Sequence, residues 1–187
     1  MRDEKQIQYV YYTEPDGLMH EAGTYSEAVV NELKDIDKRV SAYLNKLTPD
    51  TIVIITADHG HTPVKPIHLF ENPLILNLLE RTPSNDARSI TFKVKDGKKK
   101  EFEEIFNALY KNVYKLYSIE DVIKNKMIGD SKFGIHPRIK DFMGDYMACA
   151  ISNYYFQYKE YDNFDFKSHH AGITKDEMEV PICIVRK

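Results

Sequence analysis

Three short clusters of aspartate and histidine contain the side chains of this sequence that are best suited to bind a metal ion. The clusters read Asp16-x-x-x-His20, Asp58-His59-Gly60-His61 and Ser168-His169-His170-Ala171-Gly172, and they hold five of the seven histidines. Carboxylate and imidazole ligands without cysteine suit Zn²⁺, and also Mn²⁺ or Fe²⁺. One Asp–His pair is common by chance, but three clusters on one chain predict a metal centre.

The second cluster follows directly on a predicted strand. The run Ile52-Val53-Ile54-Ile55 is β-branched without alternation, which is typical of a strand buried on both faces of a parallel sheet. Ligands in such folds collect beyond the carboxyl ends of the strands, which is where Asp58 and His59 lie. Residues 51–62 are therefore the first candidate site.

The first cluster also follows a predicted strand, over residues 7–13, which is rich in aromatic and β-branched side chains. A turn sequence, Glu14-Pro15-Asp16-Gly17, comes next. The i, i+4 spacing puts Asp16 and His20 on one face if this segment forms a helical turn. Asp16 could instead simply begin a turn, with His20 as an exposed polar residue.

A helix is expected to begin near Thr24, because Thr24-x-x-Glu27 has the spacing of a capping box. Its apolar positions recur every three or four residues and predict one face packed on a sheet: Val29, Leu33, Ile36, Val40, Tyr43 and Leu47. Residues 7–55 are thus predicted to form a strand–helix–strand unit with parallel strands.

Residues 65–144 are predicted to be an insertion, a small α+β cap. The pattern indicates a short helix around 74–79, a strand at 89–94, a helix from 102 to 116 and a helix start at Ser118-x-x-Asp121. Its histidines, His68 and His136, are expected to be structural or solvated. Residues 1–64 and 145–187 would form the metal-binding α/β core, with further strands at 146–152 and 180–185.

The composition is that of an ordinary globular chain of 187 residues, with a formal net charge of -3 that gives no reason to expect a nucleic-acid partner. No apolar stretch approaches the roughly 20 residues needed to span a membrane. The N-terminus lacks the apolar core of a signal peptide. Cys149 and Cys183 lie in apolar, strand-like runs, so buried free thiols and a cytoplasmic location are expected.

Taken in order, the three clusters resemble the motifs of the alkaline phosphatase superfamily, and especially of type I phosphodiesterase/nucleotide pyrophosphatase proteins. The matching segments are Asp16-x-x-x-His20, Thr56-Ala57-Asp58-His59-Gly60, and His170-x-Gly172 ahead of Glu177-Met178-x-Val180-Pro181. The resemblance implies part of a three-layer α/β/α core with a mostly parallel sheet. It covers both ends of the chain but not the insertion.

The resemblance also implies two metal sites. Asp16, His20 and His170 would hold one ion, with His169 as the rival of His170. Asp58 and His59 would belong to the second ion, and His61 is an alternative ligand. Zn²⁺ is the expected ion and Mn²⁺ or Fe²⁺ are alternatives.

By the same resemblance the substrate would be a phosphate ester or a nucleotide. Two metal ions about 4 Å apart can stabilise both the attacking and the leaving oxygen in displacement at phosphorus.

Members of this family have a further metal-binding Asp and a Ser or Thr nucleophile upstream of the first motif. Only about a dozen residues precede Asp16, so the chain is expected to be the C-terminal half of such an enzyme and inactive alone. None of the hydroxyls near the motifs matches the nucleophile: Thr13, Thr56, Thr62 and Ser168. The alternatives are a non-catalytic domain that binds a metal or a phosphorylated ligand, and a metal-dependent phosphomutase.

Overall fold

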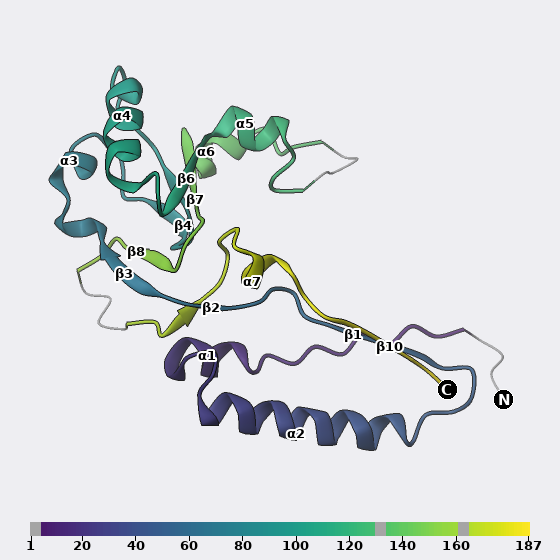
Figure 1. The fold of residues 1–187 in the computed structure, drawn as a ribbon. Helices are drawn as coiled ribbons and strands as arrows, with labels where there is room; N and C mark the ends of the chain where they lie inside the picture. The colour runs from purple at the N-terminus through teal and green to yellow at the C-terminus, as the bar shows by residue number, and fades with distance from the viewer. Residues whose placement is uncertain (1–4, 130–133, 161–164) are drawn as a thin grey trace.

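The computed structural model describes residues 5–129, 134–160 and 165–187. Its helices are α1 (Asp16–Ala22), α2 (Glu27–Leu44), α3 (Pro73–Leu76), α4 (Lys99–Tyr110), α5 (Ile119–Lys124), α6 (Ile139–Met143) and α7 (Lys175–Met178), with a 3₁₀ turn η1 (Leu69–Glu71). Its strands are β1 (Ile52–Thr56), β2 (Thr62–Pro63), β3 (Lys65–His68), β4 (Ser84–Asp86), β5 (Ser89–Phe92), β6 (Tyr114–Ser118), β7 (Tyr146–Ala150), β8 (Tyr154–Gln157), β9 (Ser168–His169) and β10 (Ile182–Arg186). The insertion forms one end of the molecule, and α1, α2, β1 and β10 form the other (Figure 1).

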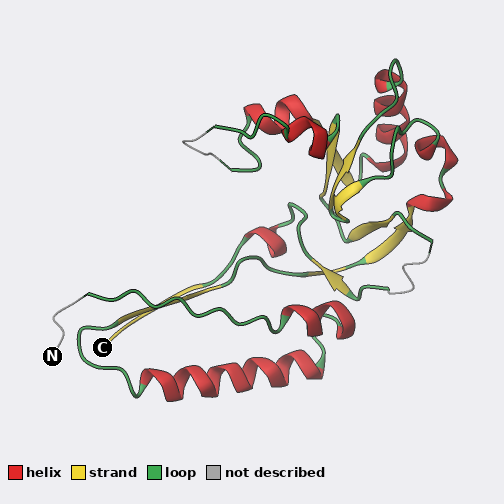
Figure 2. Cartoon of the chain, turned by 180° about the vertical axis from the view of Figure 1, so that it is seen from behind, coloured by secondary structure: helices red, strands yellow, loops and turns green. Residues whose placement is uncertain are grey.

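The long helix α2 runs beside a ribbon of two strands, β1 and β10 (Figures 1 and 2). The helix begins after Ser26, whose hydroxyl accepts a hydrogen bond from the Val29 amide. The predicted start near Thr24 is therefore wrong by two residues. Its apolar stripe is only partly covered. Val29 is buried, Ile36, Val40 and Leu47 are half-buried, and Leu33 and Tyr43 are 47% and 44% exposed.

Residues 7–13 form no strand, which contradicts the predicted strand–helix–strand unit. This segment is bound to α2 by side-chain hydrogen bonds instead of a backbone ladder. Tyr12 Oη donates to Glu32, and the hydroxyl of Tyr43 lies 3.2 Å from Gln8 Oε1. Ile7 and Tyr9 remain exposed, so no apolar layer holds the segment in a sheet.

The predicted strand at 52–55 is confirmed as β1, but it is not buried on both faces. It pairs antiparallel with β10, and Ile54 lies opposite Ile184. Both isoleucines are about two-thirds exposed, at 64% and 67%. Cys183 on β10 is exposed as well, so the prediction of a buried thiol is wrong there, whereas Cys149 on β7 is buried.

Strand direction differs from the mostly parallel sheet that was expected. Among the described residues, only β3 and β8 pair in parallel, and the other ladders are antiparallel. A parallel pair needs a long crossover connection, which the insertion supplies between β3 and β8. The fold is a mixed α/β arrangement with a partial core.

The main hydrophobic core lies in the insertion. Its sheet has the order β4-β5-β7-β6, and α4 packs against it through Phe102 and Phe106. β7 begins two residues after the predicted end of the insertion yet lies between β5 and β6, so this sheet includes a strand from the segment 145–187. Beside it, the rings of Tyr114 and Phe156 stack with centroids 4.2 Å apart.

The helices of the insertion largely follow the sequence pattern. The start after Ser118 is confirmed, since its hydroxyl accepts a hydrogen bond from the Asp121 amide. The helix expected to reach residue 116 ends at Tyr110, and Leu116 lies on β6. No helix in the described parts of the chain is long and apolar enough to cross a membrane.

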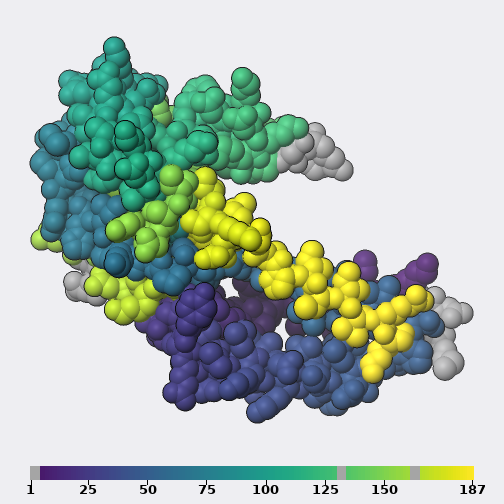
Figure 3. All heavy atoms as spheres, viewed as in Figure 1, coloured from purple at the N-terminus to yellow at the C-terminus, as the bar shows by residue number. Residues whose placement is uncertain are grey.

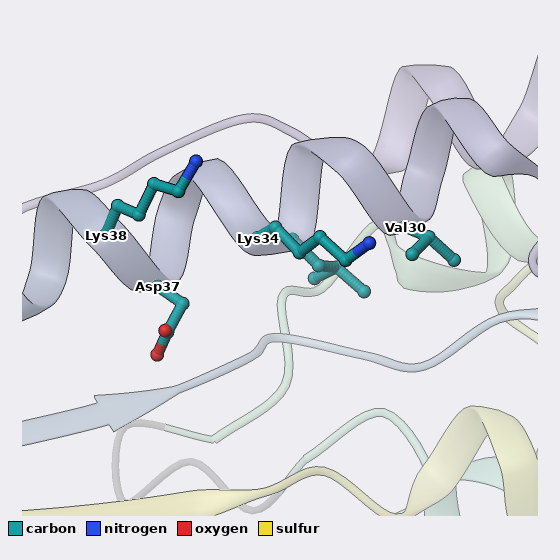
Figure 4. Close-up of a pocket in the computed structure, with 5 residues that line it drawn as sticks. Val30, Lys34, Asp37 and Lys38 are labelled. Carbon is teal, nitrogen blue, oxygen red and sulfur yellow. The ribbon is translucent and has the colours of Figure 1, made fainter.

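A hollow beside α2 is lined by Val30, Leu33, Lys34, Asp37 and Lys38 (Figure 4). None of these residues belongs to the three metal-ligand clusters. The candidate site is therefore sought where the three clusters meet.

Candidate metal centre

Helix α1 and strand β9 bring the first and third clusters together. Asp16 and His20 lie one turn apart on α1, with Oδ1 and Nε2 separated by 3.5 Å, so the segment does form the helical turn that puts both side chains on one face. The Lys167 amide donates to the His20 carbonyl at 2.9 Å, and Ser168 Oγ donates to the Met19 carbonyl at 2.6 Å. These bonds hold α1 against the strand that precedes His170.

Three imidazoles have their Nδ1 atoms beside oxygen acceptors. His20 Nδ1 lies 2.9 Å from the Ser168 carbonyl, and His59 Nδ1 lies 3.2 Å from the Gly60 carbonyl. His61 Nδ1 lies 3.2 Å from Ser168 Oγ. A carbonyl can only accept, so in a neutral His20 or His59 this contact places the proton on Nδ1 and the free lone pair on Nε2. This is the orientation of histidines that bind metals through Nε2.

Four Nε2 atoms converge on one carboxylate oxygen, Asp16 Oδ1. The distances are 2.7 Å from His61, 3.5 Å from His20, 3.6 Å from His170 and 4.0 Å from His59. The three clusters, remote in sequence, thus meet at a single point. The Asp16 side chain is 43% exposed, so this point is open to solvent.

The spacing of these atoms fits a metal ion. Four ligands at tetrahedral corners around zinc lie roughly 3.3 Å apart. The His20 and His170 distances to Asp16 are close to that value. Two overlapping groups have all their ligand atoms within 4.8 Å of one another: Asp16, His59, His61 and His170, and then His20, His169 and His170. Such a mixed oxygen and nitrogen set suits Zn²⁺, Mn²⁺ or Fe²⁺.

The hydrogen bonds of Ser168 also require a proton, or an ion in its place, between His61 and Asp16. Because Ser168 Oγ donates its proton to the Met19 carbonyl, it accepts from His61 Nδ1. The Nε2 of a neutral His61 then directs a lone pair at Asp16 Oδ1, only 2.7 Å away. Two lone pairs at that distance repel unless a proton or a metal ion lies between them.

The protonation equilibria of the site favour metal binding. Burial acts to raise the pKa of Asp16, but the hydrogen bond from His61 and the charges of His20, His61 and His170 lower it overall. Burial lowers the pKa of His61 and of His170, and neighbouring imidazoles lower both further. Neutral imidazoles and an ionised carboxylate are the forms that bind metals, so the direction of these shifts is compatible with a metal site.

The structure places Asp58 at the margin of this cluster. Its side chain is 63% exposed, and Oδ1 lies 3.7 Å from His59 Nε2. Oδ1 also accepts a hydrogen bond from the His59 amide. Asp58 therefore adjoins His59, but it is not among the groups of side chains that could hold one ion together in the described residues.

His169 points into the protein beside the cluster. Its Nδ1 accepts a hydrogen bond from the His170 amide at 2.8 Å and lies 3.9 Å from Asp86. Burial lowers the pKa of His169 to about 3, with further contributions from His20 and His170. His170, its predicted rival, faces Asp16 at 3.6 Å.

One residue that contacts this region, Arg88, has no signal in the sequence that assigns it a role. Arg88, from the turn between β4 and β5, forms a buried ion pair with Glu177 on α7. Glu177 lies in a segment that contributed to the family resemblance, but Arg88 lies in the insertion, where no motif distinguishes it. The hydroxyl of Ser168 is fully buried and already hydrogen-bonded, as described above.

Together, the mixed α/β fold and a convergent Asp–His cluster define a candidate metal-dependent member of the alkaline phosphatase superfamily. The type I phosphodiesterase/nucleotide pyrophosphatase family model matches residues 2–174. The chain therefore belongs to this family. A search of curated proteins found no match.

Solved structures share the fold at low sequence identity. Human ectonucleotide pyrophosphatase/phosphodiesterase 5 is 21% identical, with a TM-score of 0.69 over 94% of this chain and 46% of that one. An inactive variant of the murine protein in complex with AMP is 19% identical, with a TM-score of 0.64 over 92% and 45%. Phosphonoacetate hydrolase from Sinorhizobium meliloti 1021, in complex with phosphonoformate, is 18% identical, with a TM-score of 0.62 over 90% and 43%. The chain thus spans less than half the length of these relatives.

Proposed function

We propose that this chain is the metal-binding part of a hydrolase that acts on phosphate esters, with nucleotides as the substrate class. The observation that supports the proposal most is the convergence of Nε2 atoms from His20, His59, His61 and His170 on Asp16 Oδ1. Family membership and the AMP complex of a related structure support the substrate class.

In this proposal Asp16, His20 and His170 hold one divalent ion, most suitably Zn²⁺. His59 and Asp58 belong to a second site, which requires further ligands. His61, which lies against Asp16, is an alternative ligand of the first site. A bound Zn²⁺ supplies a Lewis acid and lowers the pKa of a coordinated water.

The chain's own residues orient the ligands and control their protons. Ser168 orients both His20 and His61 through its carbonyl and hydroxyl oxygens. Burial lowers the pKa of His61 and of His170, which favours the neutral imidazoles that can bind a metal. No hydroxyl of the three clusters is assigned as the nucleophile, so we propose that the isolated chain hydrolyses phosphate esters poorly or not at all.

Zinc titration calorimetry combined with a phosphodiesterase assay tests the proposal. The wild-type chain is expected to bind about one Zn²⁺, and Asp16→Asn is expected to weaken binding more than about 100-fold, because even outer-shell partners are worth 10–100-fold. Turnover of bis(p-nitrophenyl) phosphate should stay near background. No Zn²⁺ binding by a folded wild-type chain, or strong metal-dependent turnover that survives loss of Asp58 and His59, would refute these roles.

The second candidate function is a non-catalytic metal-binding domain. Its support is that the cluster joins α1 to the segment around β9, so an ion there would stabilise the fold. A chelator is then expected to lower the melting temperature. An unchanged melting temperature, with no metal in the purified protein, would rule out a structural ion.

A further inference from the structure

Two fully buried side chains of opposite charge connect the insertion to the loop that follows His170. Arg88 Nε lies 2.5 Å from Glu177 Oε1, and Arg88 Nη2 lies 2.6 Å from Glu177 Oε2. The side chains are 0% and 1% exposed. Buried charges are costly unless they are paired and their remaining hydrogen-bonding groups are satisfied. The other partners of this ion pair therefore show what it holds in place.

The carboxylate oxygens of Glu177 also accept hydrogen bonds from the backbone that follows His170. Its Oε1 accepts from the Gly172 amide at 2.7 Å, and its Oε2 accepts from the Thr174 amide at 3.2 Å. The Thr174 hydroxyl donates to the same Oε2 at 2.5 Å. One carboxylate thus fixes the chain at the second and fourth residues after the histidine.

Arg88, the partner in the insertion, is also held by further hydrogen bonds. Arg88 Nη1 donates to the Tyr154 carbonyl at 2.5 Å, and the Arg88 carbonyl accepts from the Ala150 amide at 2.7 Å. The next residue, Ser89, donates its hydroxyl to the Ala171 carbonyl. Both residues that follow His170 are therefore contacted directly by side chains of the pair or its neighbour.

The loop between these contacts has a conformation that needs such support. Ala171 has a φ of 75°, which L-residues rarely adopt. At Gly172, an added Cβ would lie 2.7 Å from Glu177 Oε2 and 2.8 Å from Arg88 Nη2. The ion pair thus packs directly against a backbone segment that would relax without it. These two residues directly follow His170, whose Nε2 lies 3.6 Å from Asp16 Oδ1, so their conformation bears on the direction of that ring.

We propose that Arg88 and Glu177 are positioning residues for His170, so that the insertion, through its buried ion pair, holds this imidazole within the metal-binding cluster. The inference rests on the proposed function only in taking a metal ion as the ligand of His170. The placement of the ring itself is a separate, measurable property.

The test compares Arg88→Lys, Arg88→Met and Glu177→Gln with the wild-type chain. Histidine side-chain ¹H–¹⁵N spectra of the metal-free proteins report the placement of His170, and calorimetry reports Zn²⁺ affinity. We expect shifted or broadened His170 resonances and a 10–100-fold loss of Zn²⁺ affinity, as for other outer-shell partners. Arg88→Lys keeps the positive charge but cannot form the two parallel hydrogen bonds of the guanidinium. This variant should therefore fold and still show the altered His170 resonances and the loss of Zn²⁺ affinity.

Asp145→Asn is the matched control. Asp145, the first residue after the insertion, is another buried carboxylate. It lies 2.7 Å from Lys99 Nζ and accepts a hydrogen bond from the Val94 amide, and no hydrogen bond or ion pair of its side chain with residues 170–174 is found among the described residues. It should lower the melting temperature and leave the His170 resonances and Zn²⁺ affinity unchanged.

Unchanged His170 resonances in folded Arg88→Lys and Glu177→Gln proteins would overturn the proposal, even if both are less stable. If Arg88→Met does not fold, the Arg88→Lys and Glu177→Gln variants alone test the proposal. If the wild-type chain binds no Zn²⁺, the proposed function fails, whereas the metal-free spectra still test the positioning.

Discussion

The rings of His59 and His170 stack with their centroids 3.8 Å apart and their planes 17° from parallel. This contact joins the second and third clusters, which the family resemblance assigns to different ions. His59 also lowers the pKa of His170, after the larger effect of burial. The two rings therefore act on one another before any ion binds.

Substitution of His59 can separate stacking from ligation. His59→Phe keeps an aromatic ring beside His170 but removes Nε2, and His59→Ala removes both. If His59 contributes a ligand, both variants should lose Zn²⁺ affinity, as measured by calorimetry. If it only packs, Phe should restore the affinity that Ala loses, by a factor within the 10–100-fold range of outer-shell partners.

Ser168→Ala should destabilise the protein and weaken the metal centre together. The substitution leaves the Met19 carbonyl without its donor and His61 Nδ1 without its acceptor. The free energy of unfolding in urea should fall by about 1–3 kcal/mol, the cost of buried unsatisfied groups. Ser118→Ala, which removes an N-cap remote from the clusters, should cost about 1 kcal/mol and leave Zn²⁺ affinity unchanged.

Gly60→Ala should be poorly tolerated for a steric reason. Its added Cβ would lie 1.9 Å from the Asp176 carbonyl oxygen, while the Gly60 amide donates to the Glu177 carbonyl at 2.9 Å. We expect a loss of more than about 3 kcal/mol in urea unfolding, beyond ordinary overpacking. Gly97→Ala is the control, because Gly97 has φ +74° and open space around it, so only backbone strain of about 1–2 kcal/mol is expected. Equal losses in both variants would contradict the steric account.

Asp145 should make stability fall in acid. Burial acts to raise its pKa, but the hydrogen bonds from Lys99 and the Val94 amide, with the charges of Lys93 and Lys99, lower it overall. A carboxylate with a lowered folded-state pKa stabilises the protein above its ordinary pKa, and this contribution is lost as the pH falls through the folded value. Urea unfolding between about pH 3 and pH 7 should therefore give a shallower pH dependence for Asp145→Asn. An unchanged slope would show that Asp145 does not titrate with folding.

The isoleucine face of the β1–β10 ribbon should promote self-association. Ile54 and Ile184 lie opposite each other and are 64% and 67% exposed. Ile54→Lys with Ile184→Glu puts opposite charges at this pair, which antiparallel strands tolerate. Sedimentation should show less association for the double variant at an unchanged melting temperature. Val53→Lys, on the other face of β1, is the control and should lower the melting temperature.

The sequence predicts the metal-ligand clusters because their chemistry is local. Asp16 and His20 needed only one helical turn to meet, and the turn after Pro15 supplies it. The role of His61 could not be ranked from the sequence, because its contact with Asp16 depends on how β2 pairs with β9. Arg88 had no pattern at all, since its partner lies far away on α7.

The sheet was harder to predict because its pairing also depends on residues far apart in the sequence. A run such as 52–55 specifies a strand, but burial and direction depend on what lies beside it. Here β10 is the paired neighbour of β1 in the described chain, so the run that suggested a doubly covered strand forms an exposed ribbon. Residues 7–13 have strand-forming side chains but bind α2 through hydroxyls and amides instead.

The unequal distribution of buried side chains implies that the metal centre does not open as one unit. Helix α1 has no buried residue, whereas the insertion contains the aromatic core and, through Arg88, holds the loop after His170. Segments with few buried contacts open locally at lower free energy than a packed core. Amide hydrogen exchange in α1 should therefore be fast while β5 and β7 remain protected. The proposed ligands Asp16 and His20 would then leave and rejoin a His170 that stays in place, so release of a metal ion bound as proposed would begin from the α1 side.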